Sequence, residues 1–270
     1  MYLLQSVLFL FSLLLLFLFS RRYTWWRFPI DYQAPRILMY HMVHEHKART
    51  TFNKLRVTPN RFERQIGWLE EHGWYFAFIS ELTNPEKLPN KTVCITFDDG
   101  YRDNFTHVHP LLKKHHARAT LYLVADRFDR DWSINKKAHH NSGELEREPK
   151  LTDSQIRAML NSGHWQLGGH TMTHANLSRL DEEGKHAEIF HAKTLLERNF
   201  ETSLRSFAYP FGIYDESDVM IVAEAGFETA VTTRSGISQD IPRECLELKR
   251  IKISGKDNML VFCLKMRSGS

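Results

Sequence analysis

The stretch Lys91-Thr-Val-Cys-Ile-Thr-Phe-Asp-Asp-Gly-Tyr101 decides the fold of this chain. Apolar residues at alternate positions from Val93 to Phe97 predict a buried strand, and Asp98-Asp99-Gly100 ends it with residues that favour a turn. The two carboxylates therefore lie at the carboxyl end of a strand, where the active sites of α/β proteins gather. Adjacent side chains point in different directions, so one carboxylate can bind a metal while the other faces a reacting water. An ordinary Asp-Gly turn is the alternative.

A second polar stretch, Gly168-Gly169-His170-Thr-Met-Thr-His174, follows some distance along the chain. Two histidines separated by three residues share one face if the segment is helical, which lets both imidazoles reach one ion. With a carboxylate from Asp98 or Asp99 they form a two-histidine, one-carboxylate set, which is typical of a catalytic metal with open positions. The preceding glycines allow close approach of the backbone. The alternative is a chance pair, since the chain has 15 histidines.

Three motifs now occur in order: Thr96-Phe97-Asp98-Asp99-Gly100, His170-Thr-Met-Thr-His174 and Phe207-Ala-Tyr-Pro-Phe-Gly212. Together they resemble the first three motifs of the polysaccharide deacetylases with a NodB homology domain, carbohydrate esterase family 4. The resemblance extends from Arg36 to Ile253. Strands and helices alternate along this region, which predicts parallel pairing. With the resemblance, the expected fold is α/β: a distorted, incomplete (β/α)7 barrel of the NodB type, with an N-terminal transmembrane helix.

The resemblance also implies a ligand set and a base. Asp99, His170 and His174 are expected to hold a divalent ion, with zinc as the first choice and cobalt, nickel or manganese also admitted by these ligands. Such an ion lowers the pKa of a bound water and polarises an acetamide carbonyl. Asp98 is expected to take the proton of the water as general base.

The third motif is expected to line the substrate site. By analogy with the family, the backbone N–H of Phe211 stabilises the oxyanion that forms during attack on the acetyl group. Tyr209 and Pro210 are expected to shape the wall beside the substrate.

Two departures from the family pattern leave roles open. The third motif is commonly Arg-x-Pro-x-Gly, but Ala208 stands at the arginine position, and whether the nearby Arg205 orients Asp98 is open. The last motif is usually Leu-x-His, and here it is Leu248-Lys-Arg250, whose arginine cannot donate a proton at neutral pH. His41, which follows a predicted strand, is the first candidate to protonate the leaving amine; otherwise the metal and Asp98 act alone. Arg250 is expected to bind an anionic group of the substrate or to cap its strand.

Composition bounds the class of protein. The 270 residues, 42% hydrophobic and 25% charged, suit one globular domain with an appendage. A net charge of +4 without a concentrated basic face gives no case for nucleic acid as a partner. The three cysteines, Cys94, Cys245 and Cys263, are widely spaced and do not predict a disulfide framework.

The first residues are almost entirely Leu and Phe, which predicts a membrane anchor. The predicted division is a transmembrane signal-anchor at 1–20, a juxtamembrane linker at 21–35, a NodB-like deacetylase domain at 36–256 and a C-terminal tail at 257–270. The arginines that follow the anchor place this side of the span in the cytoplasm by the positive-inside rule. The expected location is the inner (plasma) membrane, single-pass, with a cytoplasmic catalytic domain; a periplasmic or extracellular domain is the alternative.

The sequence thus predicts a hydrolase of carbon–nitrogen bonds. It is expected to be a metal-dependent deacetylase that removes the N-acetyl group of an amino sugar in a polysaccharide or a lipid-linked glycan. The expected partners are an N-acetylated glycan or glycolipid substrate and the membrane. The alternative is a membrane-tethered carbohydrate-binding protein with a degenerate, inactive site. The polar segment from Asp126 to Lys150, which includes His139 and His140, is expected to form a lid or a substrate-binding insertion.

Overall fold

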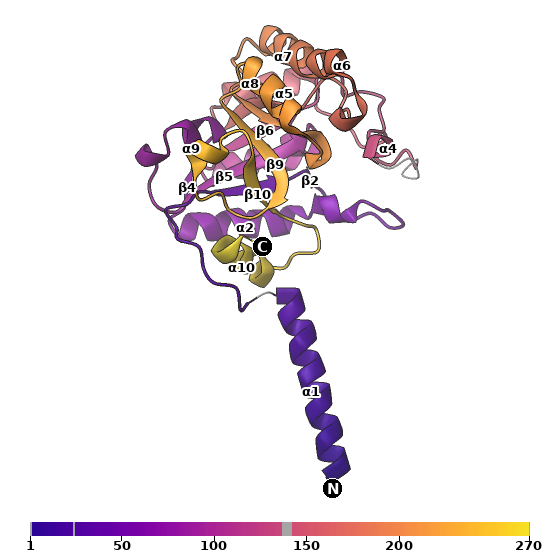
Figure 1. Ribbon diagram of the computed structural model, residues 1–270, viewed down its shortest axis with the longest axis vertical. Helices are drawn as coiled ribbons and strands as arrows, with labels where there is room; N and C mark the ends of the chain where they lie inside the picture. The colour runs from indigo at the N-terminus through magenta and orange to yellow at the C-terminus, as the bar shows by residue number, and fades with distance from the viewer. Residues whose placement is uncertain (1, 24, 137–141, 270) are drawn as a thin grey trace.

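The computed structural model describes residues 2–23, 25–136 and 142–269. Helices surround a parallel sheet that closes on itself, and the first helix projects away from this body (Figure 1). The strands are β1 Arg36–Tyr40, β2 Met42–Val43, β3 Arg56–Val57, β4 Tyr75–Phe76, β5 Thr92–Asp99, β6 Ala119–Leu123, β7 Trp165–Gly169, β8 Ser206–Ala208, β9 Thr229–Ser235 and β10 Leu248–Lys252. The α-helices are α1 Tyr2–Tyr23, α2 Pro59–Glu71, α3 His109–Lys114, α4 Ser133–Lys136, α5 Asp153–Asn161, α6 Glu182–His186, α7 Ala192–Phe200, α8 Glu216–Glu224, α9 Ile241–Glu244 and α10 Met259–Ser268.

The parallel strands form a closed ring. The order is β1-β10-β9-β8-β7-β6-β5, and β1 pairs with β5 as well as with β10, so that seven strands of the described chain complete a barrel. β4 adds to the edge of β5, while β2 and β3 pair with each other outside the barrel. The predicted parallel barrel of about seven strands is therefore confirmed. It is distorted where a single residue pair, Gly169 with Phe207, joins β7 to β8, and where the register shifts between β9 and β10.

Burial on both faces explains why β5 reads as a nearly continuous apolar run. All eight residues of β5 are buried, because one face packs inside the barrel and the other against the surrounding helices. The same close packing explains the glycine pair of β7. A Cβ atom on Gly168 would lie 2.6 Å from the ring of Tyr122 on β6, closer than any side chain tolerates. The glycines thus let β7 deliver its carboxyl end to the barrel mouth.

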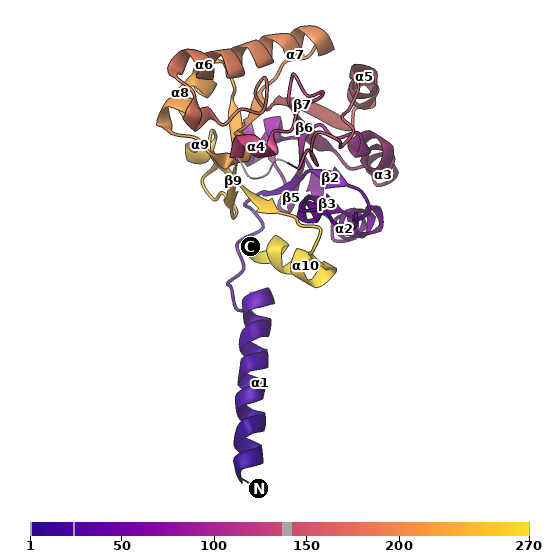
Figure 2. The same ribbon diagram turned by 90° about the vertical axis from the view of Figure 1, so that its right-hand side faces the viewer.

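Several helices begin where their sequences predict. Helix α5 has a capping box in which the Thr152 hydroxyl accepts from the Gln155 N–H and the Gln155 side chain accepts from the Thr152 N–H. Helix α2 begins with a proline, whose missing N–H is harmless in the first turn. Figure 2 shows α2, α3, α5, α6, α7 and α8 placed around the outside of the strands.

The segment 257–270 contains helix α10, which packs against the barrel. The Phe262 side chain is fully buried, and its ring lies 5.8 Å from that of Trp68 on α2. The buried guanidinium of Arg36, at the start of β1, donates a hydrogen bond to the Met266 carbonyl at 3.0 Å. Helix α10 therefore fastens the end of the chain to the strand that closes the barrel.

The N-terminal region corrects one prediction. Residues 2–23 form helix α1, and its leucine and phenylalanine side chains are exposed from Val7 to Phe19. Within the described ranges, no helix has the combination of length and apolar character needed to cross a membrane. This finding overturns the predicted transmembrane helix, the single-pass inner-membrane location and the membrane as a partner.

Candidate active site

Two adjacent carboxylates end β5 at the mouth of the barrel. Asp98 and Asp99 are each only 3% exposed. The backbone of Asp99 has a φ of +77°, so the chain turns sharply as the strand ends. This turn directs the two side chains to different partners: Asp98 faces Arg250 and His41, whereas Asp99 faces His170 and His174.

Asp99, His170 and His174 form a possible metal site. The Asp99 Oδ1 atom lies 3.4 Å from His170 Nε2 and 3.3 Å from His174 Nε2, and all three ligand atoms lie within 4.8 Å of one another. The histidines do not share a helix face. They follow β7 in a loop in which Thr171 and His174 adopt left-handed backbone conformations, with φ of +62° and +57°. The two histidines therefore converge because two residues of this loop have left-handed backbone conformations, and not because of the predicted helical spacing.

The protonation states of these groups suit a metal ion. The Nδ1 atom of His170 donates a hydrogen bond to the Ala208 carbonyl at 2.7 Å. The Nε2 atom therefore carries the free lone pair of the ring, and this lone pair faces Asp99. Burial lowers the pKa of His174, which favours its neutral form. Burial alone would raise the pKa of Asp99, but the adjacent imidazoles hold that pKa well below its usual range. Asp99 Oδ1 is buried without a well-aligned hydrogen bond. One carboxylate and two neutral imidazoles with converging lone pairs fit a divalent cation.

Arg250 of β10 binds Asp98 across the barrel. Its Nη1 and Nη2 atoms donate to the two carboxylate oxygens of Asp98 at 2.7 and 2.8 Å. The guanidinium also donates to Thr96 Oγ1 at 3.1 Å and to the Thr232 carbonyl at 2.9 Å. Burial tends to raise the pKa of Asp98, but the charge and hydrogen bonds of Arg250 outweigh it and lower that pKa. Asp98 is therefore held as a fixed, ionised carboxylate.

This arrangement answers both questions left by the departures from the family pattern. Arg205 does not reach Asp98; it forms an exposed pair with Glu228. The predicted contact of Arg250 with an anionic substrate group is corrected, because its guanidinium is fully buried and four of its five N–H groups already donate inside the barrel.

His41 lies on the open side of Asp98. It directly follows β1, and its Nε2 atom is 3.9 Å from Asp98 Oδ2. Its side chain is 18% exposed, compared with 4% for that of Asp98. The imidazole is thus the solvent-facing neighbour of the carboxylate.

The third motif places Phe211, but not the ring of Tyr209, beside the cluster of Asp99, His170 and His174. Phe211 has a φ of +59°, and its ring stands edge-on to His174 with centroids 4.4 Å apart. Pro210 is buried beside it in the short helix η7, Pro210–Gly212. The Tyr209 ring is buried in the core against Tyr214, and its hydroxyl donates to the Leu246 carbonyl at 3.0 Å. Its predicted place in the substrate wall is corrected: Tyr209 supports the turn from behind.

Three residues of the site escaped sequence reasoning. The Trp132 ring lies 5.2 Å from that of His174, and the Lys150 ammonium lies 4.7 Å from the Trp132 ring and 5.0 Å from the Tyr101 ring. Trp132 and Lys150 belong to the polar segment predicted as a lid or insertion, in which an isolated tryptophan was the available signal. Residues 137–141, including His139 and His140, lie outside the described residues.

Buried ion pairs attach this segment to the barrel. The guanidinium of Arg56, on β3, donates to Glu144 at 2.9 Å and to Glu148 at 2.7 Å. Glu148 also accepts from Lys47 at 2.6 Å. Lys150 donates to the Leu145 and Glu148 carbonyls. The described part of the segment is therefore a fixed wall of the site.

The fold and the site together define an α/β-barrel protein with an acid–base and metal-type centre at the carboxyl ends of its strands. Residues 85–230 match the family model for polysaccharide deacetylase. The chain belongs to the polysaccharide deacetylase family, whose members hydrolyse the carbon–nitrogen bonds of N-acetylated sugars. The predicted family and enzyme class are confirmed.

Individual relatives agree with this assignment. The chain is 30% identical over 223 residues to YxkH of Bacillus subtilis, whose name assigns it provisionally to the polysaccharide deacetylases; the match covers 81% of this chain and 71% of YxkH. It is 26% identical to the poly-beta-1,6-N-acetyl-D-glucosamine N-deacetylase of Staphylococcus aureus, covering 66% of this chain and 64% of that protein. The chain thus spans less than two thirds of the staphylococcal relative.

Solved structures agree at the level of the fold and the sequence. The Streptococcus pyogenes deacetylase PplD, solved with acetate, superposes with a TM-score of 0.72 at 26% identity, covering 88% of this chain and 99% of PplD. A polysaccharide deacetylase from Bacillus cereus superposes with a TM-score of 0.73 at 26% identity, covering 87% of this chain and 69% of the other.

Proposed function

We propose that this protein removes the acetyl group from N-acetylated amino sugars of a polysaccharide, with Asp98 as general base. The observation that carries the proposal is the buried, ionised Asp98, held by Arg250 beside an Asp99, His170 and His174 cluster. The names of its relatives support the substrate class, and a polymer of N-acetylglucosamine is the favoured substrate.

Asp99, His170 and His174 are the residues that hold a divalent ion, with zinc as the first choice and cobalt, nickel or manganese compatible with the same ligands. When bound, such an ion lowers the pKa of a water molecule and polarises the acetamide carbonyl. Within the chain, the rings of Trp132 and Phe211 both pack against the His174 imidazole.

Asp98 accepts the proton of the attacking water. Arg250 keeps the carboxylate ionised and fixes its direction, so that no rotamer search precedes proton transfer. The water oxygen bonds to the acetyl carbon, and the bond between that carbon and nitrogen then breaks. The backbone N–H of Phe211 is the candidate donor to the carbonyl oxygen as it gains negative charge.

His41 supplies the proton that the leaving amine requires. It occupies the exposed side of Asp98 at 3.9 Å, so a protonated imidazole there can reach the nitrogen of a substrate seated over the carboxylate. Acetate and an amino sugar leave. The loss of the usual Leu-x-His histidine at position 250 therefore does not leave the site without a proton donor. This weakens the alternative of an inactive carbohydrate-binding protein.

The test measures acetate release and metal content for the full chain, with N-acetylglucosamine oligomers as substrates. Asp98→Asn should retain bound metal and lose about two to four orders of magnitude in kcat, because it removes only the base. His174→Ala should lose metal as well as activity. Glu86→Gln, which neutralises an exposed carboxylate outside the site, is the control and should behave as the wild type. Acetate release by Asp98→Asn at the wild-type rate would contradict the proposal.

A further inference from the structure

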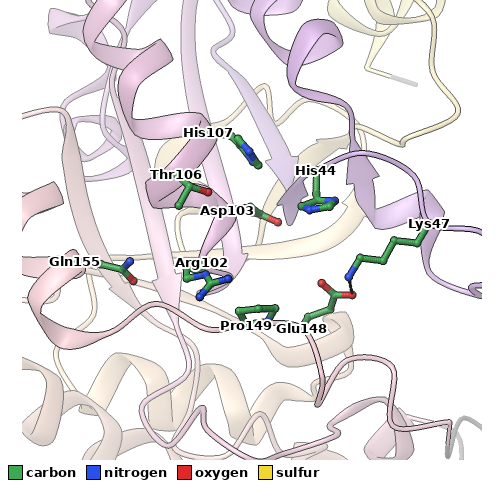
Figure 3. A pocket seen from close by; sticks show the side chains of 9 residues that line it. All are labelled: His44, Lys47, Arg102, Asp103, Thr106, His107, Glu148, Pro149 and Gln155. Atoms are coloured by element: carbon green, nitrogen blue, oxygen red, sulfur yellow. Dashed lines mark hydrogen bonds and ion pairs between the residues drawn. The ribbon is translucent and has the colours of Figure 1, made fainter.

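A polar cavity of about 380 Å³ is lined by residues that follow β2 and β5 and by part of the segment before α5. Its volume is in the range of small-ligand pockets. It shares no residue with the catalytic cluster. Figure 3 shows the nine residues that line it: His44, Lys47, Arg102, Asp103, Thr106, His107, Glu148, Pro149 and Gln155.

Asp103 is a buried carboxylate that lines this cavity without a cationic partner. The residue is 9% exposed. Its Oδ1 atom accepts from Asn104 Nδ2 at 2.8 Å, and the backbone N–H of Val43 also supports it. No salt bridge to Asp103 occurs among the residues that the structure describes. The other acid of the cavity, Glu148, is already neutralised by Arg56 and Lys47.

The environment of Asp103 penalises its negative charge. Burial raises its pKa to about 7, and the charge of Glu148 adds to the effect, while the Val43 N–H, His44 and Asn104 oppose it. A buried carboxylate of this kind is stabilised by any cation that enters the cavity. Lys47 is engaged by Glu148, and Arg102 is exposed, so neither fills this role.

The rest of the lining suits a hydroxylated ligand. Thr106, Gln155, His44 and His107 offer hydrogen-bond donors and acceptors in one small volume. A shallower hollow of about 560 Å³ shares Thr106 and His107 with the cavity. The two hollows are therefore adjacent.

We propose that the cavity binds an ammonium-bearing sugar unit, that is, a de-N-acetylated residue of the glycan, with Asp103 as its counter-ion. The inference rests on the proposed function, because deacetylation is the reaction that creates this ammonium group. The Asn104 side chain links the two sites: its Nδ2 atom donates both to Asp103 and to the His41 carbonyl at 3.0 Å. The protein would then prefer chains that already carry free amino groups.

The experiment compares the binding of a glucosamine trimer and an N-acetylglucosamine trimer of the same linkage by calorimetry at about pH 7, where a substantial fraction of Asp103 and of the amino groups is charged. The full chain carries Asp98→Asn, so that neither trimer is consumed. We expect the glucosamine trimer to bind at least about tenfold more tightly, a difference of about 1.4 kcal/mol. Asp103→Asn, which keeps the hydrogen-bonding shape, should abolish that preference.

Two further variants complete the test. Thr106→Lys places an ammonium group at the cavity and should also abolish the preference, which keeps the test decisive if Asp103→Asn does not fold. Glu86→Gln removes the same charge at an exposed position and should leave the preference intact. Equal affinity for the two trimers, or an unchanged preference in Asp103→Asn, would overturn the inference. Acetate release is not part of this readout, so a failed deacetylase assay and a failed amine preference are separate outcomes.

Discussion

Arg250 and Asp98 form a two-point ion pair although 152 residues separate them along the chain. The arginine comes from β10 and the aspartate from β5, with β1 between the two strands in the ring. Bidentate pairing fixes both the charge and the orientation of the carboxylate. The common family pattern places an arginine in the third motif. Here the arginine that pairs with Asp98 comes from β10 instead.

Replacing Arg250 should damage catalysis far more than replacing Arg205. We expect Arg250→Leu to reduce kcat by about two orders of magnitude or more, because Asp98 loses its fixed orientation. Arg205→Leu should change kcat little, since exposed ion pairs contribute at most about 1 kcal/mol. Steady-state kinetics with metal analysis checks both variants, and comparable losses in the two would refute the assignment of Arg250.

The role of His41 can be separated from that of Asp98 by the choice of leaving group. His41→Ala should lose about two orders of magnitude or more with N-acetylglucosamine oligomers, because the amine must be protonated to leave. It should lose much less with an aryl acetate, whose leaving group departs as a stable anion. Asp98→Asn should be impaired with both substrates, because both need the attacking water. If His41→Ala lost the same factor in rate with both substrates, His41 would not be the general acid.

Gly212 should tolerate no side chain. Its φ is +66°, and an added Cβ would lie 2.0 Å from Thr233 Oγ1 and 2.7 Å from Thr233 Cβ. Gly212→Ala should therefore lower the free energy of unfolding by about 3 kcal/mol or more through strain and overpacking.

Gly163→Ala is the matched control for that substitution. Gly163 has a similar φ of +74°, but nothing lies within 4 Å of its added Cβ, so only about 1 kcal/mol of backbone strain is expected. Denaturant unfolding of both variants isolates the contribution of the contact with Thr233. Similar losses of stability in the two variants would mean that backbone strain alone accounts for the effect of Gly212→Ala.

Asp103 should make stability fall with rising pH. Its folded-state pKa of about 7 lies above the ordinary value of 3.8, so between these limits the native state binds a proton that the unfolded state does not. The free energy of unfolding therefore decreases through this window, by roughly 4 kcal/mol for this one group. Asp103→Asn lacks the titration, so its stability relative to the wild type should rise from pH 4 to pH 8.

Unfolding curves of the two proteins at several pH values measure this difference. The comparison is needed because the other ionisable side chains near Asp103, including His44, His107 and Glu148, are present in both proteins. A constant difference between wild type and Asp103→Asn across the range would show that Asp103 has an ordinary pKa.

Much of the site was accessible from the sequence because it depends on local patterns. A strand that ends in Asp98-Asp99 and a strand that ends before His170 must deliver these residues to the same barrel edge once the strands are parallel. The clustering of Asp99, His170 and His174 follows from topology and residue type. The helical spacing inferred for the histidines was not required, since left-handed turns at Thr171 and His174 achieve the convergence.

The remaining features depend on long-range packing that local patterns do not specify. The partner of Arg250 depends on β1 joining β5 to β10, and the direction of the Tyr209 ring depends on the core around Tyr214. Lys150 lies over Trp132 in a segment that Arg56 attaches to the barrel through Glu144 and Glu148. The N-terminal leucine-rich run predicted an anchor from composition alone, which the described helix α1 does not support.

The closure of the barrel by β1 sets an order for assembly during synthesis. β1 and β5 emerge early from the ribosome, but β10 is translated about 150 residues after β5, and with it comes Arg250. Until then the nascent sheet has an open edge, and the carboxylate of Asp98 has no counter-charge to compensate its removal from water. Completion of the ring and pairing of Asp98 with its counter-charge are therefore the same event. A ribosome-stalled or proteolysed chain that ends before β10 should hold neither a closed barrel nor a paired Asp98.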